Sequence, residues 1–258
     1  MQTFVKHTKR VNTVRWLSLS HFISGSDDGL ALFWSIETLT SPQCCYMRGH
    51  TSGVNAVDGL QSADSKGKWL LATAAADSTI RLWSIGASND SEAECIQIIP
   101  IKDNGFCFCL RMFEMPISNH VILSWGADDD SVAVWAKSNL SATFSHLHSL
   151  KGHEDWVRGM DVIMEGNDIL LATSSQDNFI RLWRMSPRTK EQFEKTTDIL
   201  KMLDSSLADL KVDETILKID NDMYAISIES VLCGHEGWVY GVQWHKSEEH
   251  GKYFLCIL

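Results

Sequence analysis

Two short motifs recur along this chain at a nearly constant spacing, and this repetition constrains its fold more than any other feature. In the first motif an Asp stands six residues before a Trp, and the four copies end at Trp34, Trp83, Trp135 and Trp183. Successive tryptophans are 49, 52 and 48 residues apart. A period of this length indicates an array of similar structural units.

The second motif is a histidine that is followed by apolar residues four and seven positions later. Its copies are His7, His50, His153 and His235. Short apolar runs at 69–72 and 169–172 lie between the two motifs, and the residues before the tryptophans alternate between apolar and polar. Such alternation is typical of half-buried strands. We therefore expect three or four short strands in each repeat, paired as antiparallel sheets.

A Gly-His pair, a turn containing Asp and a strand ending in Trp resemble the repeat of the WD-repeat β-propeller family. The resemblance implies an all-β fold built from four-stranded blades. It also implies that a hydrogen-bond chain of Trp, Ser or Thr, His and Asp stabilises each blade. Carried over position by position, the implied networks are His50, Thr73, Asp77 and Trp83; His153, Thr173, Asp177 and Trp183; and His7, Ser24, Asp28 and Trp34.

The third repeat departs from this pattern at two positions. Asp103 stands where the histidine is expected, and Trp125 replaces the hydroxyl residue, although Asp129 and Trp135 are present. We expect plain side-chain packing to replace the hydrogen-bond network in this repeat.

The 258 residues are interpreted as one partial propeller with about four to five blades. The repeats lie near 7–36, 50–85, 103–136, 153–185 and 235–258. The family usually closes with about seven blades, so the resemblance implies an incomplete part of such a ring. A closed five-bladed ring is the alternative.

Residues 186–228 interrupt the repeats with a charged insertion that lacks glycine. Apolar residues recur at helical spacing at Ile199, Leu203, Leu207 and Leu210. Thr197 and Asp198 precede them and provide an N-terminal cap for a short helix. The insertion is therefore either a solvated loop between two strands or an amphipathic helix that docks a partner.

Charge and cysteine content argue against several classes of protein. The chain has 23 basic and 33 acidic residues, a net charge of −10, which disfavours broad electrostatic binding of nucleic acid. No apolar run approaches the ~20 residues that a membrane-spanning helix needs. The seven cysteines include no CxxC pair, which favours a reducing intracellular compartment. We therefore expect neither a membrane protein nor a secreted one.

No catalytic or cofactor-binding motif is visible, because the chain lacks GxSxG, P-loop, HExxH and GxGxxG patterns. We therefore expect no enzyme, no cofactor and no metal. His146 and His148 have a spacing that zinc could use, but no Cys or carboxylate is in register with them, so surface positions are expected. Cys107 and Cys109 are expected to be small core residues. The run of acidic residues at 128–130 is explained by a turn.

The remaining candidate for function is a surface around the Gly-His motifs. In propellers the loops before the first strand and around the Asp turn form one rim, which commonly binds partners. Trp and Arg are enriched where binding energy concentrates. The candidate partner-binding residues are Trp156, Arg158, Gln176, Trp238 and Tyr240. The alternative is that the two tryptophans pack beneath neighbouring loops.

Longer segments resemble a narrower family, the second subunits of the Elongator complex. The similar segments are 70–83, 150–162, 170–183 and 231–244. The resemblance implies a non-catalytic scaffold that supports modification of the tRNA wobble uridine and, in older descriptions, transcription elongation. It implies a large propeller scaffold subunit and a catalytic acetyltransferase subunit as partners, at most peripheral contact with tRNA, and a cytoplasmic and nuclear location. The alternative is a peptide-reading adaptor, such as a ubiquitin ligase substrate receptor or a chromatin reader.

Overall fold

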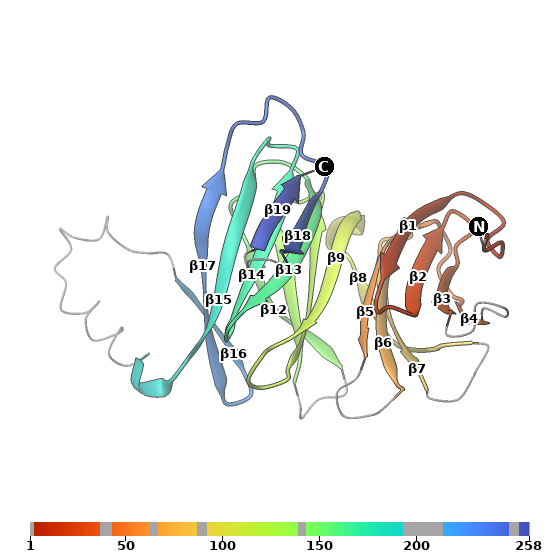
Figure 1. Cartoon of the computed structure of the whole chain (residues 1–258), viewed down its shortest axis with the longest axis horizontal. Helices are drawn as coiled ribbons and strands as arrows, with labels where there is room; N and C mark the ends of the chain where they lie inside the picture. Colours follow the sequence, from red (N-terminus) through yellow and green to blue (C-terminus); the bar gives the residue numbers. More distant parts are fainter. Residues whose placement is uncertain are drawn as a thin grey trace.

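The computed structural model describes residues 3–36, 43–61, 67–86, 92–138, 143–192, 214–247 and 253–257. Within these ranges the chain forms five antiparallel sheets that follow one another in sequence order. Figure 1 shows them running from β1–β4 at one end of the view to β15–β17 at the other. The predicted all-β architecture of propeller blades is confirmed.

The sheets differ in their number of strands. The first contains β1 (Val11–Trp16), β2 (His21–Ser26), β3 (Ala31–Ser35) and β4 (Gln43–Met47). The second contains β5 (Val54–Gln61), β6 (Trp69–Ala75), β7 (Thr79–Ile85) and β8 (Glu94–Pro100). After the 3-10 turn η1 (Lys102–Asn104), the third contains β9 (Cys107–Glu114), β10 (Val121–Ala127), β11 (Val132–Lys137) and β12 (Phe144–Leu150). The fourth contains β13 (Val157–Glu165), β14 (Asp168–Ser175), β15 (Ile180–Arg188), β17 (Asp222–Leu232) and β16 (Thr215–Ile219), and the fifth contains β18 (Val242–Lys246) and β19 (Tyr253–Ile257).

Each Asp of the repeat lies in a tight turn between the second and third strands of its sheet. In the second sheet Ala75 pairs with Thr79 across this turn. The residue after the Asp has a left-handed backbone, with φ of 59° at Ser78 and 69° at Asn178. Three-residue hairpin loops commonly end in such a residue, so the turn fixes the register of the two strands.

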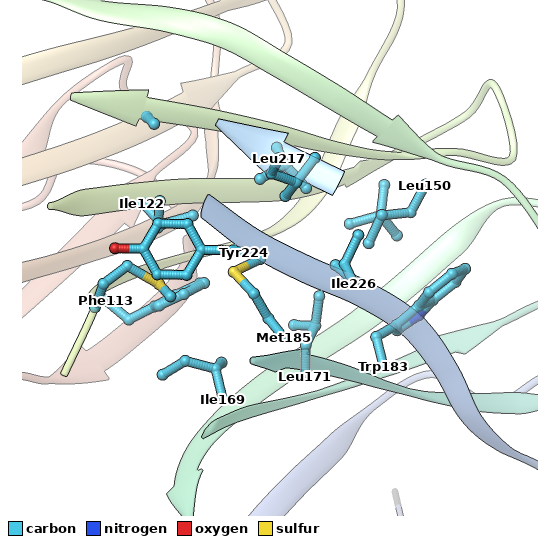
Figure 2. Packing of buried hydrophobic residues seen from close by; sticks show 14 of the residues in the cluster. Phe113, Ile122, Leu150, Ile169, Leu171, Trp183, Met185, Leu217, Tyr224 and Ile226 are labelled. Atoms are coloured by element: carbon cyan, nitrogen blue, oxygen red, sulfur yellow. The ribbon is translucent and has the colours of Figure 1, made fainter. Parts of the chain in front are cut away.

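Neighbouring sheets pack face to face through apolar clusters. The largest joins the third and fourth sheets, and Figure 2 shows Phe113 and Ile122 of the third near Leu171 and Met185 of the fourth. Similar clusters join the first sheet to the second and the second to the third. The first strand of each sheet contacts the first strand of the next, so β1, β5, β9, β13 and β18 are the inner strands of the propeller.

The insertion is shorter than the expected range 186–228. Residues 186–188 still belong to β15, and β17 pairs with β15 as the fourth strand of its sheet. β16 is a fifth strand on the outer edge of β17. Alternating apolar residues of β16, such as Leu217 and Ile219, are buried against the third sheet, which explains why this part is ordered into the blade. The helix expected around 199–210 lies outside the described residues.

No helix in the described part of the chain is long and apolar enough to cross a membrane.

Candidate functional site

The second sheet holds a buried hydrogen-bond chain built from the four residues that the resemblance implied. His50 precedes β5, Thr73 lies in β6, Asp77 in the following turn and Trp83 in β7. His50 Nε2 is 2.7 Å from Thr73 Oγ1, and Trp83 Nε1 donates to the same oxygen at 2.9 Å. His50 Nδ1 is 2.9 Å from Asp77 Oδ2. The chain ties the entry loop, the central strand, the turn and the third strand together.

The fourth sheet repeats this arrangement and adds an arginine. His153 Nε2 is 2.8 Å from Thr173 Oγ1, and its Nδ1 is 2.8 Å from Asp177 Oδ2. Trp183 Nε1 donates to Thr173 Oγ1 at 3.0 Å. Arg181 Nη1 donates to Asp177 Oδ2 at 2.8 Å, so this carboxylate is also part of an ion pair.

The first sheet contains the same hydrogen-bond chain, with a serine in place of the threonine. His7 Nε2 is 2.8 Å from Ser24 Oγ, and Trp34 Nε1 donates to that oxygen at 2.9 Å. His7 Nδ1 is 3.1 Å from Asp28 Oδ2. In all three sheets the backbone N–H of the residue after the histidine also donates to the Asp.

Burial and hydrogen bonding determine the protonation states of His50, His153 and Asp77. Burial lowers the pKa of His50 and of His153, and the hydrogen bonds that the two imidazoles make to their Asp partners oppose the shift without cancelling it. Burial alone would raise the pKa of Asp77, but hydrogen bonds from Thr79, the Thr51 N–H and His50 outweigh it and lower the pKa. In the second sheet a neutral His50 imidazole, donating from Nδ1 to the ionised Asp77 and accepting at Nε2, satisfies these groups. In the fourth sheet Arg181 Nη1 also lies 2.7 Å from His153 Nδ1.

The third sheet has no such chain among its described residues. The rings of Trp125 and Trp135 pack with centroids 5.5 Å apart. Trp135 Nε1 is buried and has no hydrogen-bond partner in the part of the chain that the structure describes. Asp103 lies in η1 with an exposed side chain. Among the described residues, Asp129 accepts hydrogen bonds from the backbone and hydroxyl of Ser131 alone, at 3.1 and 2.6 Å. Tryptophan packing therefore takes the place of the network.

A second set of charged residues lines the inner strands and was missed by the sequence analysis. Each charged residue lies eight positions after the motif histidine or its equivalent, and the set is Arg15, Asp58, Arg111 and Asp161. The uncharged Gln243 has this position in the fifth repeat. Arg15 Nε is 3.4 Å from Asp58 Oδ1, and Arg15 Nη2 is 3.3 Å from Asp161 Oδ1. Arg111 Nε is 3.0 Å from Asp161 Oδ1. Arg15, Arg111, Asp161 and Gln243 line an axial groove of about 610 Å³. The signal that could have revealed the charged set is the alternation of Arg and Asp at one position of the repeat.

The structure brings four of the five predicted rim residues to the surface. Trp156, Trp238 and Tyr240 are 42%, 56% and 53% exposed. The guanidinium carbon of Arg158 lies 4.2 Å from the ring centroid of Phe108 and 5.4 Å from that of Tyr240. Gln176 is the exception, because its residue is buried and its N–H donates to the Trp156 carbonyl at 3.0 Å. Gln176 thus holds the loop that carries Trp156 in place and is not part of the exposed patch.

The other candidate residues, His146, Cys107 and Cys109, contact protein groups only in ways that serve the fold. His146 Nε2 is 3.1 Å from Ser149 Oγ on β12. Within the described ranges no three His, Cys, Asp or Glu side chains form a group that could hold a metal ion. Cys107 and Cys109 are buried, and burial raises the pKa of Cys109 to about 11. A thiol with so high a pKa is a poor nucleophile at neutral pH.

Comparison with known proteins identifies the repeats. The family described as "WD domain, G-beta repeat" matches residues 1–35, 41–84 and 144–184. The chain is 48% identical to Elongator complex protein 2 of Drosophila melanogaster over 256 residues, which cover 96% of this chain and 32% of that protein. It is 32% identical to the Homo sapiens protein of that name, covering 92% and 28%. Identity to the Saccharomyces cerevisiae protein is 25%, covering 95% and 30%. The chain thus spans about a third of the length of these relatives.

Proposed function

Because this chain is a WD40-repeat protein homologous to Elongator complex protein 2, we propose that it acts as a non-catalytic scaffold within the Elongator complex. Its proposed partners are the large propeller scaffold subunit and the catalytic acetyltransferase subunit. Through them it supports modification of the tRNA wobble uridine, with at most peripheral contact between this chain and tRNA. We propose a cytoplasmic and nuclear location, as this role requires.

One observation carries the scaffold proposal. The histidines and carboxylates that could suggest catalysis occur as three copies of the same buried chain, in the first, second and fourth sheets. Each copy joins the strands of its own blade, and the imidazole nitrogens are already hydrogen-bonded to protein groups. An enzyme needs one accessible site, whereas a repeated buried network serves the fold. The exposed aromatic rim then provides the surface for partners.

The test is affinity purification of the tagged full chain from cells, with mass spectrometry of the proteins that co-purify. We expect both proposed Elongator subunits with the wild type. A Trp156→Ala, Trp238→Ala double variant should recover markedly less of them, since these side chains are exposed and removing them changes the rim rather than the core. Leu19→Ala is the matched control, because Leu19 is fully exposed in the β1–β2 turn. Recovery of unrelated proteins, or of no protein, would contradict the proposal.

A second candidate function is the peptide-reading adaptor. The observation that favours it is the axial groove, which is lined by charged side chains such as Arg111 and Asp161 and opens beside Arg158 and Tyr240. Such an adaptor would co-purify with a ubiquitin ligase or with chromatin proteins, and its recovery would depend on Arg111 rather than on Trp238.

A further inference from the structure

The axial groove has an excess of positive charge, although the chain as a whole has a net charge of −10. Its lining includes three arginines, Arg15, Arg111 and Arg158. Among the described residues, Asp161 is the one acidic side chain in this lining. Even when the buried Asp58 beside Arg15 is counted, the three arginines exceed the two carboxylates by one charge. The groove is therefore basic in an otherwise acidic protein.

Both carboxylates at the groove are already engaged with protein groups. Asp161 Oδ1 lies 3.0 Å from Arg111 Nε and 3.3 Å from Arg15 Nη2, and its Oδ2 accepts the Trp244 N–H at 2.8 Å. Asp58 Oδ1 lies 3.4 Å from Arg15 Nε, and its Oδ2 accepts a backbone N–H of β9 at 2.9 Å. The excess positive charge is therefore that of Arg158.

Arg158 has no counter-ion in the described part of the chain. No carboxylate there lies within 4.0 Å of its guanidinium, and no acceptor there bonds its N–H groups. Two aromatic rings hold it instead, because the guanidinium carbon lies 4.2 Å from the ring centroid of Phe108 and 5.4 Å from that of Tyr240. A guanidinium carries five N–H donors in a planar fork that matches a carboxylate. Arg158 is thus an oriented donor that lacks an anion.

The Cys109 thiol shows that two of these charges act on the same wall of the groove. Cys109 is buried and belongs to the groove lining. Burial raises its pKa, and the charges of Arg111 on β9 and Arg158 on β13 both oppose this rise. The fields of two arginines from neighbouring sheets therefore overlap there, and both would attract an anion in the groove.

We propose that the axial groove binds an acidic segment of a partner protein, whose carboxylates pair with Arg158 and with the neighbouring Arg15 and Arg111. Arginine–carboxylate hydrogen bonds are charge-assisted and often bidentate. The volume of about 610 Å³ is in the range of ligand sites, and Tyr240 and Trp244 add aromatic surface to the lining. The inference rests on the peptide-reading candidate function and names its ligand class. Nucleic acid fits less well, because the net charge of −10 repels its phosphates.

The test measures binding of labelled probes to the full chain by fluorescence anisotropy. The probes are a peptide of alternating Glu and Gly, the same peptide with Gln in place of Glu, and single-stranded oligothymidine. We expect the Glu peptide to bind at least tenfold more tightly than either other probe, and to bind more weakly as salt screens the charges. Equal binding of the Glu and Gln peptides would overturn the proposal, as would a preference for oligothymidine or no binding of the Glu peptide.

Substitution of Arg158 tests whether the peptide lies in the groove. Arg158→Gln should weaken the Glu peptide about three- to tenfold, because it removes the unpaired guanidinium without breaking an ion pair of the fold. Arg158→Lys should have an intermediate affinity, since it keeps the charge but loses the forked donors. Arg48→Gln is the matched control, because it removes the same charge from a side chain that is 54% exposed and lies outside the groove. Equal effects of Arg158→Gln and Arg48→Gln would place the peptide elsewhere and overturn the proposal.

The peptide measurements and the co-purification test can fail separately. If the Glu peptide binds through Arg158 but neither a ubiquitin ligase nor chromatin proteins co-purify with the chain, the adaptor role is wrong and the ligand class of the groove stands. If such partners co-purify in a manner that depends on Arg111 but the Glu peptide does not bind, the adaptor role stands and the ligand class is wrong.

Discussion

The carboxylate of Asp77 accepts hydrogen bonds from His50, the Thr51 N–H and Thr79, and its side chain is only 8% exposed. Asp77→Ala removes the acceptor and leaves these donors buried or half-buried without a partner. We expect the free energy of unfolding to fall by about 2–4 kcal/mol. Asp129→Ala should cost less than about 1 kcal/mol, because Asp129 is exposed and bonds only to Ser131.

Urea denaturation of the two variants measures this difference. Asp177→Ala should resemble Asp77→Ala, since Asp177 accepts from His153 and Arg181. Equal losses for Asp77→Ala and Asp129→Ala would mean that the turn, and not the hydrogen-bond chain, accounts for the stability.

The two fully buried imidazoles also predict how stability depends on pH. The pKa values of His50 and His153 are lowered from 6.5, so below that pH the unfolded chain binds protons that the folded chain does not. Stability should therefore fall as pH decreases from about 7 to about 5. The pKa values of Asp28, Asp77 and Asp177 are lowered from 3.8, so their contribution is present above that pH and is lost as pH falls further.

Unfolding titrations in urea at several pH values test this expectation. His50→Gln should reduce the slope between about pH 7 and pH 5, because one histidine with a lowered pKa is removed while His153 and His148 remain. His146→Gln is the control, since His146 lies on the exposed side of β12. A stability that stays constant or rises on acidification in this range would contradict the assignment of neutral, buried imidazoles.

Among the strands, those nearest the motifs were the easiest to predict. The alternation before each Trp and the Asp turn specify the second and third strands of a blade, and the structure has β6 and β7 where the runs at 69–72 and 80–83 indicated. β16 and β17 were not predicted, because the charged composition of 186–228 is typical of a solvated loop and obscures the strand pattern within it. The signals were present, since Leu217, Lys218 and Ile219 alternate and Asp220 and Asn221 are turn residues. In the structure Asp220 has a φ of 53° in the turn between the two strands.

The hydrogen-bond networks could be placed from sequence because each member has a fixed position in the repeat. The inner ring of charges could not be placed from sequence. The repeat pattern is recognised by its apolar residues four and seven positions after the histidine, whereas the charged residue comes at the next position and its side chain faces the axis. Whether a polar side chain is exposed or buried there depends on how blades surround the axis, as for Arg15 and Asp161, which are 146 residues apart in sequence. Gln176 shows the same limit, because its burial follows from the packing of the Trp156 loop.

This inner ring predicts coupling between blades. Asp161, with a side chain 8% exposed, pairs with Arg111 of the third sheet and Arg15 of the first, and also accepts the Trp244 N–H at 2.8 Å. Asp161→Asn removes the counter-ion of Arg111 and leaves Arg15 with Asp58 alone, and it should lower the free energy of unfolding by about 2–4 kcal/mol. The stability of one blade should thus depend on charges held by two others.

A double-mutant cycle isolates the pair. Arg111→Met and Asp161→Asn should show a coupling energy of about 1–3 kcal/mol in urea denaturation, because both side chains are largely buried and bond directly. The coupling of Arg15 with Asp161 should be smaller, since Arg15 is 29% exposed and water screens its charge. Arg48→Met with Glu92→Gln is the matched control, an ion pair of similar length, 3.1 Å, whose side chains are 54% and 65% exposed. If the Arg111–Asp161 coupling is no larger than that of this exposed pair, the ring of charges does not hold the blades together, and apolar packing between the sheets is the sole source of their coupling.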